Sequence, residues 1–302
     1  MLELNNYNIT EKIYESPNTI IYRGHREHDM KPMMFKVLRG EHITPTQLSY
    51  YRQEYEIIRN LDSPNIIKAY DLQKYENGLV LVLEDFGGIS LKEFMTDNEL
   101  TTHEFLELAI NIVDAIAELH EHNIIHKHIT PCNILVNSKG SNQAKWKIKL
   151  IDFAIATTLP QQIMAVKSVH KMEGTLTYMA PEQTGRMNRP LDYRADFYAL
   201  GVTFYEILTH SLPFETNDLM ELMHAHLTNM PFPPHQIKPD IPEVVSEIVL
   251  KLMEKDCEDR YQSAYGVKTD LEICRQQWRT LGQIILFPLG LQDVPKRFRH
   301  AE

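Results

Sequence analysis

Histidines gather in one short stretch of the chain. Residues 120–128 read HEHNIIHKH, so four of these nine positions are histidine: His120, His122, His126 and His128. Histidine can serve as a general base or as a metal ligand. A metal site would require the side chains to converge on one point. The stretch therefore allows either acid–base chemistry or metal binding, and its surroundings must decide between them.

Two more side chains, Lys36 and Asp152, could bind a charged ligand. Lys36 lies in the strand-like run MFKVL, and Asp152 follows the apolar residues of LIDFAIA. Taken alone, Lys36 reads as a surface lysine on a strand and Asp152 as a turn residue. The predicted strands and helices around Lys36 and Asp152 are needed to decide between these surface roles and ligand binding.

The first part of the chain has the pattern of a small sheet with one helix. Residues 7–40 alternate in strand fashion, with turn signals at SPN and EHDMK. Residues 44–62 carry apolar side chains at helical spacing. Two strand-like runs follow at 66–75 and 78–86. We expect one helix packed on a sheet formed by these strands.

The pattern becomes mostly helical after the glycine pair at 87–88. Two short strands are expected around the histidine stretch and Asp152, at 133–137 and 146–156. The Pro-rich segment MPFPPHQIKPDIP reads as a loop. Helical spacing predicts helices at 90–95, 102–123, 194–210, 218–229, 243–256 and 263–281.

A β-rich part, a helical part and several ordered motifs together give a resemblance. The order of MFKVL, HKHITPCN, LIDFAIA and TYMAPE resembles a eukaryotic-type Ser/Thr protein kinase domain over about residues 7–275. The resemblance implies an α+β, bilobal protein-kinase fold with a small β-rich N-lobe and a larger α-helical C-lobe. It places the N-lobe at 7–86, the C-lobe at 87–279 and a linker-like tail at 280–302.

The resemblance implies ATP and Mg²⁺ as ligands and assigns roles to four residues. Lys36 would contact the α- and β-phosphates, and Glu54 would hold Lys36 by an ion pair. Glu56 is the alternative partner on the same helix. Asn133 and Asp152 would bind Mg²⁺.

Further residues receive binding or structural roles from the same resemblance. The expected ATP-binding residues, besides Lys36, Glu54, Asn133 and Asp152, are Ile13, Ile21, Met34, Glu84, Phe86 and Leu135. The expected structural residues are His126, Glu182, Asp196 and Arg260, with Glu182 paired to Arg260. Thr175 matches a threonine near the substrate site, although a plain loop hydroxyl is the alternative.

The glycine-rich loop of the family is missing. Its three glycine positions fall on Tyr14, Ser16 and Thr19 in YESPNT, and Pro17 removes one backbone N–H. Side chains at these places should keep the loop away from the phosphates. Met34 replaces a small residue that faces the adenine, so it could fold aside or fill the pocket.

His128 stands where the family has its catalytic aspartate. Losing a positioned base costs about 10²–10⁴ in rate. Thr130 replaces a lysine near the γ-phosphate, and Lys127 replaces an arginine. In this layout His120 and His122 end a helix and its turn while His126 is buried, which disfavours a metal cluster. The remaining histidines are expected on the surface.

Longer segments point to one branch of the family. The run EGTLTYMAPEQTGRMNRPLDYRADFYALGVTFYE, together with the tail FPLGLQD, is similar to the N-terminal kinase-like domain of large bacterial signalling proteins. Such proteins continue into ATPase-like and sensor modules and often a histidine kinase. Their catalytic loop usually reads His-Lys-Asp, so His128 departs even from this group.

Three functions fit these residues. The favoured one is a pseudokinase in a signalling pathway that binds ATP weakly and acts on protein partners, including downstream ATPase or sensor modules. The alternative is a Ser/Thr protein kinase of low activity in which His128 or Asp152 substitutes for the missing base. A scaffold without nucleotide is the third, if Met34 blocks the pocket.

The composition of the chain restricts its possible binding partners and its cellular location. The 302 residues carry a formal net charge of -10, which argues against a nonspecific nucleic-acid or anionic-membrane binder. No run is long and apolar enough for membrane insertion, and no signal peptide is visible. Cys132, Cys257 and Cys274 form no CxxC pair. These features predict a cytoplasmic protein.

Overall fold

The computed structural model describes residues 4–40, 42–137, 146–158, 176–187 and 189–294. The chain divides into two units, which are treated separately. The N-terminal unit runs to Gly88 and also includes Lys149–Ile155, and the C-terminal unit holds Ile89–Ile148 and the chain from Ala156 onward. A β-rich first part and a helical second part confirm the predicted kinase fold class. Thr175 lies outside the described residues.

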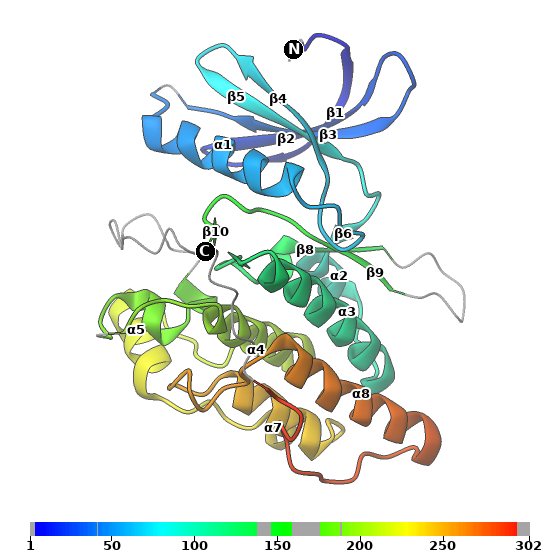
Figure 1. Ribbon diagram of the computed structural model, residues 1–302, viewed down its shortest axis with the longest axis vertical. Helices are drawn as coiled ribbons and strands as arrows, with labels where there is room; N and C mark the ends of the chain where they lie inside the picture. Colours follow the sequence, from blue (N-terminus) through cyan, green and yellow to red (C-terminus); the bar gives the residue numbers. More distant parts are fainter. Residues whose placement is uncertain (1–3, 41, 138–145, 159–175, 188, 295–302) are drawn as a thin grey trace. The chain divides into compact units, whose positions relative to one another are not determined.

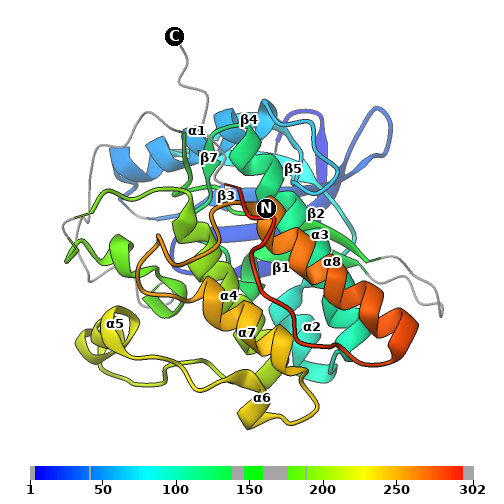
Figure 2. The same ribbon diagram turned by 60° about the horizontal axis from the view of Figure 1, so that its bottom comes forward.

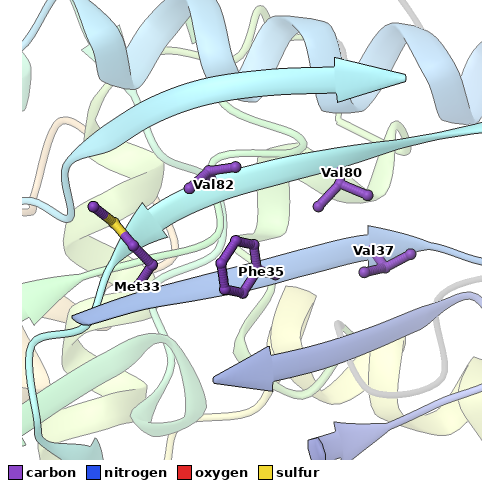
Figure 3. Close-up of a cluster of buried hydrophobic side chains, with 5 residues drawn as sticks. All are labelled: Met33, Phe35, Val37, Val80 and Val82. Carbon is purple, nitrogen blue, oxygen red and sulfur yellow. The ribbon is translucent and has the colours of Figure 1, made fainter. Parts of the chain in front are cut away.

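The N-terminal unit is built on one antiparallel sheet of five strands in the order β1-β2-β3-β5-β4 (Figure 1). The strands are β1 Tyr7–Glu15, β2 Thr19–Arg26, β3 Pro32–Leu38, β4 Ala69–Tyr75 and β5 Gly78–Glu84. Alternate residues of β3 and β5 supply a fully apolar cluster on one face, formed by Met33, Phe35, Val37, Val80 and Val82 (Figure 3). Because side chains alternate along a strand, Met34 and Lys36 of β3 point to the opposite face.

Helix α1, Pro45–Arg59, packs against that opposite face. Thr44 begins the helix: its hydroxyl accepts from the backbone N–H of Gln47, and the Gln47 side chain accepts from the Thr44 N–H. The buried residues of α1 include Tyr51, Glu54 and Ile58, spaced three and four apart on one face. Tyr51 joins a second apolar cluster with residues of β3 and β5.

The C-terminal unit is mostly helical. Its helices are α2 Leu91–Asp97, α3 Thr102–Glu121, α4 Arg194–Thr209, α5 Leu219–Thr228, α6 Pro234–Ile237, α7 Glu243–Leu252 and α8 Ala264–Leu281. Helix α4 is buried around nearly its whole circumference and forms the centre of the unit. Helices α3 and α8 lie side by side in Figures 1 and 2.

Short strands and turns complete this unit. Strands β6 Ile89–Ser90, β8 Ile134–Asn137 and β9 Lys147–Leu150 form a small sheet, although the last two residues of β9 belong to the N-terminal unit. Strand β7 Ile124–Ile125 pairs with β10 Thr157–Thr158. Single 3-10 turns lie at Pro131–Asn133, Leu176–Tyr178 and Pro181–Thr184. Among the described helices, none has the length and apolar character needed to cross a membrane.

The segment after α8 makes specific bonds back to the helix. The Asp293 carboxylate accepts from the Gln262 backbone N–H and from the Ser263 hydroxyl, next to the first turn of α8. The Gly290 N–H donates to Asp270 in the middle of the helix. These bonds fasten the predicted tail to α8 as far as Asp293, and residues 295–302 lie outside the described part.

One histidine departs from the expected surface placement. His226 on α5 is 1% exposed, and its Nδ1 lies 2.9 Å from the hydroxyl of Tyr198. Burial, together with the nearby positive charge of Lys255, lowers the pKa of His226 from 6.5 to about 4. This burial could not be predicted, because MHAHL places two histidines in one helical turn and does not show which of them faces inward.

Folding should therefore depend on pH through His226. The unfolded chain protonates this histidine near pH 6.5 and the folded chain only near pH 4, so stability falls as the pH drops through this interval. The full shift corresponds to about 3 kcal/mol. Urea unfolding of the wild type between pH 7 and pH 4.5 should show this loss, and His226→Gln should show a shallower slope. His224→Gln, an exposed histidine of the same helix, should keep the wild-type slope. Equal slopes for all three proteins would contradict the assignment.

Candidate active site

Lys36 is the centre of the charged cluster in the N-terminal unit. Its Nζ donates to both carboxylate oxygens of Glu54, at 2.9 and 2.8 Å, and to Oδ1 of Asp152 at 2.8 Å. The side chain of Glu54 is 1% exposed, that of Lys36 14% and that of Asp152 30%. Glu56 instead pairs with Arg59 near the end of α1. The structure thus joins Lys36 to Glu54 and not to the alternative, Glu56.

Three elements bring these residues together. Lys36 occupies the middle of β3, and Glu54 lies on the buried face of α1. Asp152 follows β9 with a φ of 65°, the left-handed region, which aspartate adopts more readily than most residues. A backbone hydrogen bond from Phe153 reaches Glu54, so the segment after β9 is fixed to the helix.

The cluster holds more negative than positive charge. Burial by itself lowers the pKa of Lys36, but the carboxylates of Asp152 and Glu54 outweigh burial and raise it far above its usual value. Burial raises the pKa of Glu54, the Lys36 ammonium lowers it, and the charge of Asp152 raises it again, so the net direction is upward. With two carboxylates and one ammonium, the cluster has a net negative charge, which would favour binding of a cation.

The turn between β1 and β2 replaces the missing glycine-rich loop. The Ser16 N–H donates to the Thr19 carbonyl at 2.8 Å, and the Thr19 N–H donates to Oγ of Ser16 at 3.1 Å. Pro17 has no N–H to give. Most of the backbone donors that a phosphate could use here are therefore absent or already bonded within the turn.

Among the other residues of this unit that are predicted to contact ATP, Ile21 of β2 lies directly opposite Lys36 in the sheet register. Met34 is partly buried and lies on the same face of β3 as Lys36, between Arg23 of β2 and Leu83 of β5 in register. Ile13 is 42% exposed and Tyr14 53%. Ile21, Glu84 and Phe86 are partly buried.

A second buried lysine lies at the end of β5. The Nζ of Lys149 is 2.5 Å from Oε1 of Glu84, donates to the carbonyl of Ile66 at 3.0 Å and lies 5.9 Å from the ring centre of Phe86. This pair fixes β9, the strand that precedes Asp152, to the segment 84–86. No role was expected for Lys149. The available signal was a charge inside the apolar run KIKLI, where alternation puts Lys149 on the same face as the exposed Lys147.

In the C-terminal unit, Asp196 organises the histidine stretch. The backbone N–H groups of His126 and Lys127 donate to its carboxylate at 2.9 and 2.7 Å, and Nε2 of His120 lies 2.9 Å away. Burial raises the pKa of Asp196, but the hydrogen bond and charge of His120 outweigh it and the net shift is downward. His126 is fully buried. The predicted structural residues His126 and Asp196 thus lie in one network, which also contains His120.

His128 and Asn133 contact each other within this unit. Nδ2 of Asn133 is 2.9 Å from Nδ1 of His128 and 3.0 Å from the carbonyl oxygen of His128. A carbonyl can only accept, so the Asn133 group facing it must be the amide NH₂. That group then donates to Nδ1 as well, and a neutral His128 carries its proton on Nε2. The opposite ring nitrogen is consequently a donor and not a base.

The pair expected between Glu182 and Arg260 is present. Both carboxylate oxygens accept from the guanidinium, at 2.6 and 2.9 Å, and neither side chain is more than 3% exposed. Arg260 also donates to the carbonyl groups of Arg194, Glu254 and Lys255. This buried ion pair ties the segment Pro181–Thr184 to the core of the C-terminal unit.

The element order and these two networks define a protein-kinase domain. The family model described as Protein kinase domain matches residues 7–278, and the chain belongs to that family.

Curated relatives agree with this membership. Serine/threonine-protein kinase PrkC of Bacillus subtilis is 31% identical over 246 residues, which cover 80% of this chain and 36% of the relative. Serine/threonine-protein kinase PknB of Mycolicibacterium smegmatis is 30% identical over 254 residues, 82% of this chain and 39% of the relative. This chain thus matches less than half the length of these kinases.

A third relative has a higher sequence identity over a shorter stretch. Hybrid signal transduction histidine kinase G of Dictyostelium discoideum is 48% identical over 103 residues, which cover 34% of this chain and 3% of that protein.

Removing one partner of the Lys149–Glu84 pair should destabilise the fold strongly, whereas replacing both partners with apolar residues should destabilise it little. Lys149→Met leaves a buried carboxylate without its cation, and we expect a loss of roughly 3–5 kcal/mol in the free energy of unfolding. The double variant Lys149→Met with Glu84→Leu should recover most of this loss. Urea denaturation measures both.

The control for this pair is Lys147→Met, which changes an exposed lysine of the same strand and should cost less than about 0.5 kcal/mol. If Lys149→Met were as mild as this control, the buried pair would carry no weight in the fold.

Proposed function

We propose that this chain is a signalling domain of the protein kinase family that binds ATP with Mg²⁺ and has lost, or nearly lost, phosphate transfer to protein hydroxyl groups. The observation that supports it is a contrast between two clusters. Lys36 is already paired with Glu54 and Asp152, whereas His128 replaces the residue that would activate the acceptor.

ATP binding would use the cluster around Lys36. An ammonium held by two carboxylates is positioned for phosphate oxygens, and the excess negative charge suits a divalent cation. The Asp152 carboxylate is an oxygen ligand of the kind that Mg²⁺ prefers. Asn133, in the C-terminal unit, is the second Mg²⁺ ligand that the sequence resemblance implies, and its NH₂ group faces His128. Bound Mg²⁺ would neutralise charge on the phosphates. The turn at Ser16–Thr19 offers few donors, so the affinity should be modest.

The transfer step is where the chain departs from its family. A general base must accept the proton of the attacking hydroxyl. With Nδ1 of His128 bonded to the Asn133 amide, the proton of the neutral ring is on Nε2. A protonated ring nitrogen is a donor only, because its lone pair belongs to the aromatic ring, so Nε2 cannot accept the proton of the hydroxyl. Using Nε2 as a base would require the other tautomer and the loss of the Asn133 bond.

A Ser/Thr protein kinase of low activity is the second candidate. The names of the relatives PrkC and PknB favour it, since both are called serine/threonine-protein kinases. The assembled Lys36–Glu54–Asp152 cluster favours it too, because positioning and charge stabilisation carry most of phosphoryl transfer. In this case the acceptor hydroxyl would react without a positioned base, and the rate would be low.

The partners would be proteins of a signalling pathway. The match to part of a hybrid signal transduction histidine kinase supports a kinase-like module that works beside other signalling modules. A bacterial, cytoplasmic origin and downstream ATPase or sensor modules remain proposals based on the sequence resemblance.

Nucleotide binding is tested by thermal unfolding. Mg-ATP should raise the melting temperature of the wild type, because a ligand specific to the native state stabilises it. Lys36→Met should lose most of this shift. Lys31→Met, an exposed lysine just before β3, should keep it. No shift in the wild type at millimolar Mg-ATP would leave the nucleotide-free scaffold as the correct description.

Transfer is tested with radiolabelled ATP and a generic protein substrate. The wild type should show no transfer or only a trace, and His128→Asp should raise the Lys36-dependent rate by about 10²-fold or more. His128→Asn, which adds no base, should stay at the wild-type rate.

Wild-type transfer at about 1–100 s⁻¹, the usual range of kinases, would contradict the pseudokinase proposal. Slow, Lys36-dependent transfer by the wild type would establish the second candidate.

A further inference from the structure

The turn Ser16–Thr19 is attached to α1. The hydroxyl oxygens of Thr19 and Tyr51 lie 3.1 Å apart, joining the end of the turn to the buried face of the helix. The Asn18 carbonyl accepts from the Arg39 N–H at 2.9 Å, and the Gln47 amide reaches the Asn18 side chain at 3.5 Å, the outer limit of a hydrogen bond. The turn therefore contacts α1 at its first turn and again at Tyr51.

Tyr51 occupies a position with two neighbours of interest. It is 5% exposed, and its ring packs in the apolar cluster of β3 and β5. It precedes Glu54 by three residues, so both side chains project from the same face of the helix. The ring centre is 5.5 Å from Nζ of Lys36, within the range of a cation–π contact. One side chain thus links the turn, the helix and the lysine.

We propose that Tyr51 is a positioning residue for the Lys36–Glu54 pair. Through its bond to Thr19, it makes the β1–β2 turn a strut that holds α1 in the lysine-bound position before any nucleotide arrives. In this chain the turn that lacks glycines supports the helix instead of covering phosphates. The same substitution that weakens contacts to ATP, a side chain at position 19, supplies the hydroxyl that the strut requires.

The strut makes the helix position independent of ligand. A helix that is held only by the Lys36–Glu54 pair would exchange with displaced positions, and ATP affinity would fall by the fraction of molecules that are displaced. Because the hydrogen bond between Thr19 and Tyr51 already holds α1 in place, this loss of ATP affinity does not occur. The effect on affinity rests on the proposed ATP binding, whereas the hold on α1 does not.

Hydrogen exchange of the nucleotide-free protein tests the hold directly. Tyr51→Phe and Thr19→Val each remove one hydroxyl and keep the shape of the side chain. Each should speed amide exchange of α1 and of the β1–β2 turn about fivefold, the factor for one hydrogen bond of ordinary net strength, while β3 and β5 keep their rates. The double variant should be no faster than either single one, because both remove the same bond.

The matched control is Tyr50→Phe, which removes an exposed hydroxyl from the same helix and should leave exchange unchanged. Exchange of α1 in Tyr51→Phe and Thr19→Val equal to that of Tyr50→Phe would overturn the proposal, as would additive effects in the double variant. An increase spread evenly over the whole unit would also overturn it, since that is the result of general destabilisation.

A second readout connects the strut to ligand binding. The Mg-ATP dissociation constant should rise by about the same factor in Tyr51→Phe and Thr19→Val, and no further in the double variant. If the wild type binds no Mg-ATP, the proposed function fails, but the exchange data still test whether the Ser16–Thr19 turn holds α1 through Tyr51. If it binds and exchange changes without any change in affinity, Tyr51 supports the helix but does not position the Lys36–Glu54 pair for ligand, and the proposal fails.

Discussion

A buried ammonium group must be paired, and this requirement at Lys36 organises the N-terminal unit. Glu54 supplies both carboxylate oxygens and Asp152 supplies one, each within 3 Å of Nζ. To meet there, β3 must point Lys36 toward α1, the helix must turn Glu54 inward, and Asp152 must adopt a positive φ. The apolar clusters on the two faces of the sheet fix the first two of these conditions.

The division of labour in the proposed site follows from which residues have been replaced. The cluster around Lys36 keeps a lysine, two carboxylates and an excess of negative charge, which suit phosphate and a divalent cation. The histidine stretch keeps its frame through Asp196, but the side chain that should accept a proton is an imidazole whose Nδ1 is bonded to Asn133. Under the proposed function, such a domain would bind a nucleotide and respond to it without transferring phosphate.

Strong local patterns in the sequence were enough to predict the fold and two of the ion pairs, Lys36–Glu54 and Glu182–Arg260. Strand alternation, helical spacing and motif order gave the two parts of the chain, and the motif match chose Glu54 over Glu56. Contacts between distant residues could not be read in this way. Thr19 and Tyr51 are 32 positions apart, and Lys149 and Ile66 are 83 apart. The tautomer of His128 and the burial of His226 depend on which atoms the fold places beside each ring.

The claim that two carboxylates and one ammonium form a cation-dependent nucleotide site can be measured by calorimetric titration of ATP with and without Mg²⁺. We expect the wild type to bind ATP at least about tenfold more tightly with Mg²⁺, a difference of about 1.4 kcal/mol, and we expect Asp152→Asn to lose this difference. Equal affinity of the wild type with and without Mg²⁺, or no binding in either condition, would contradict it.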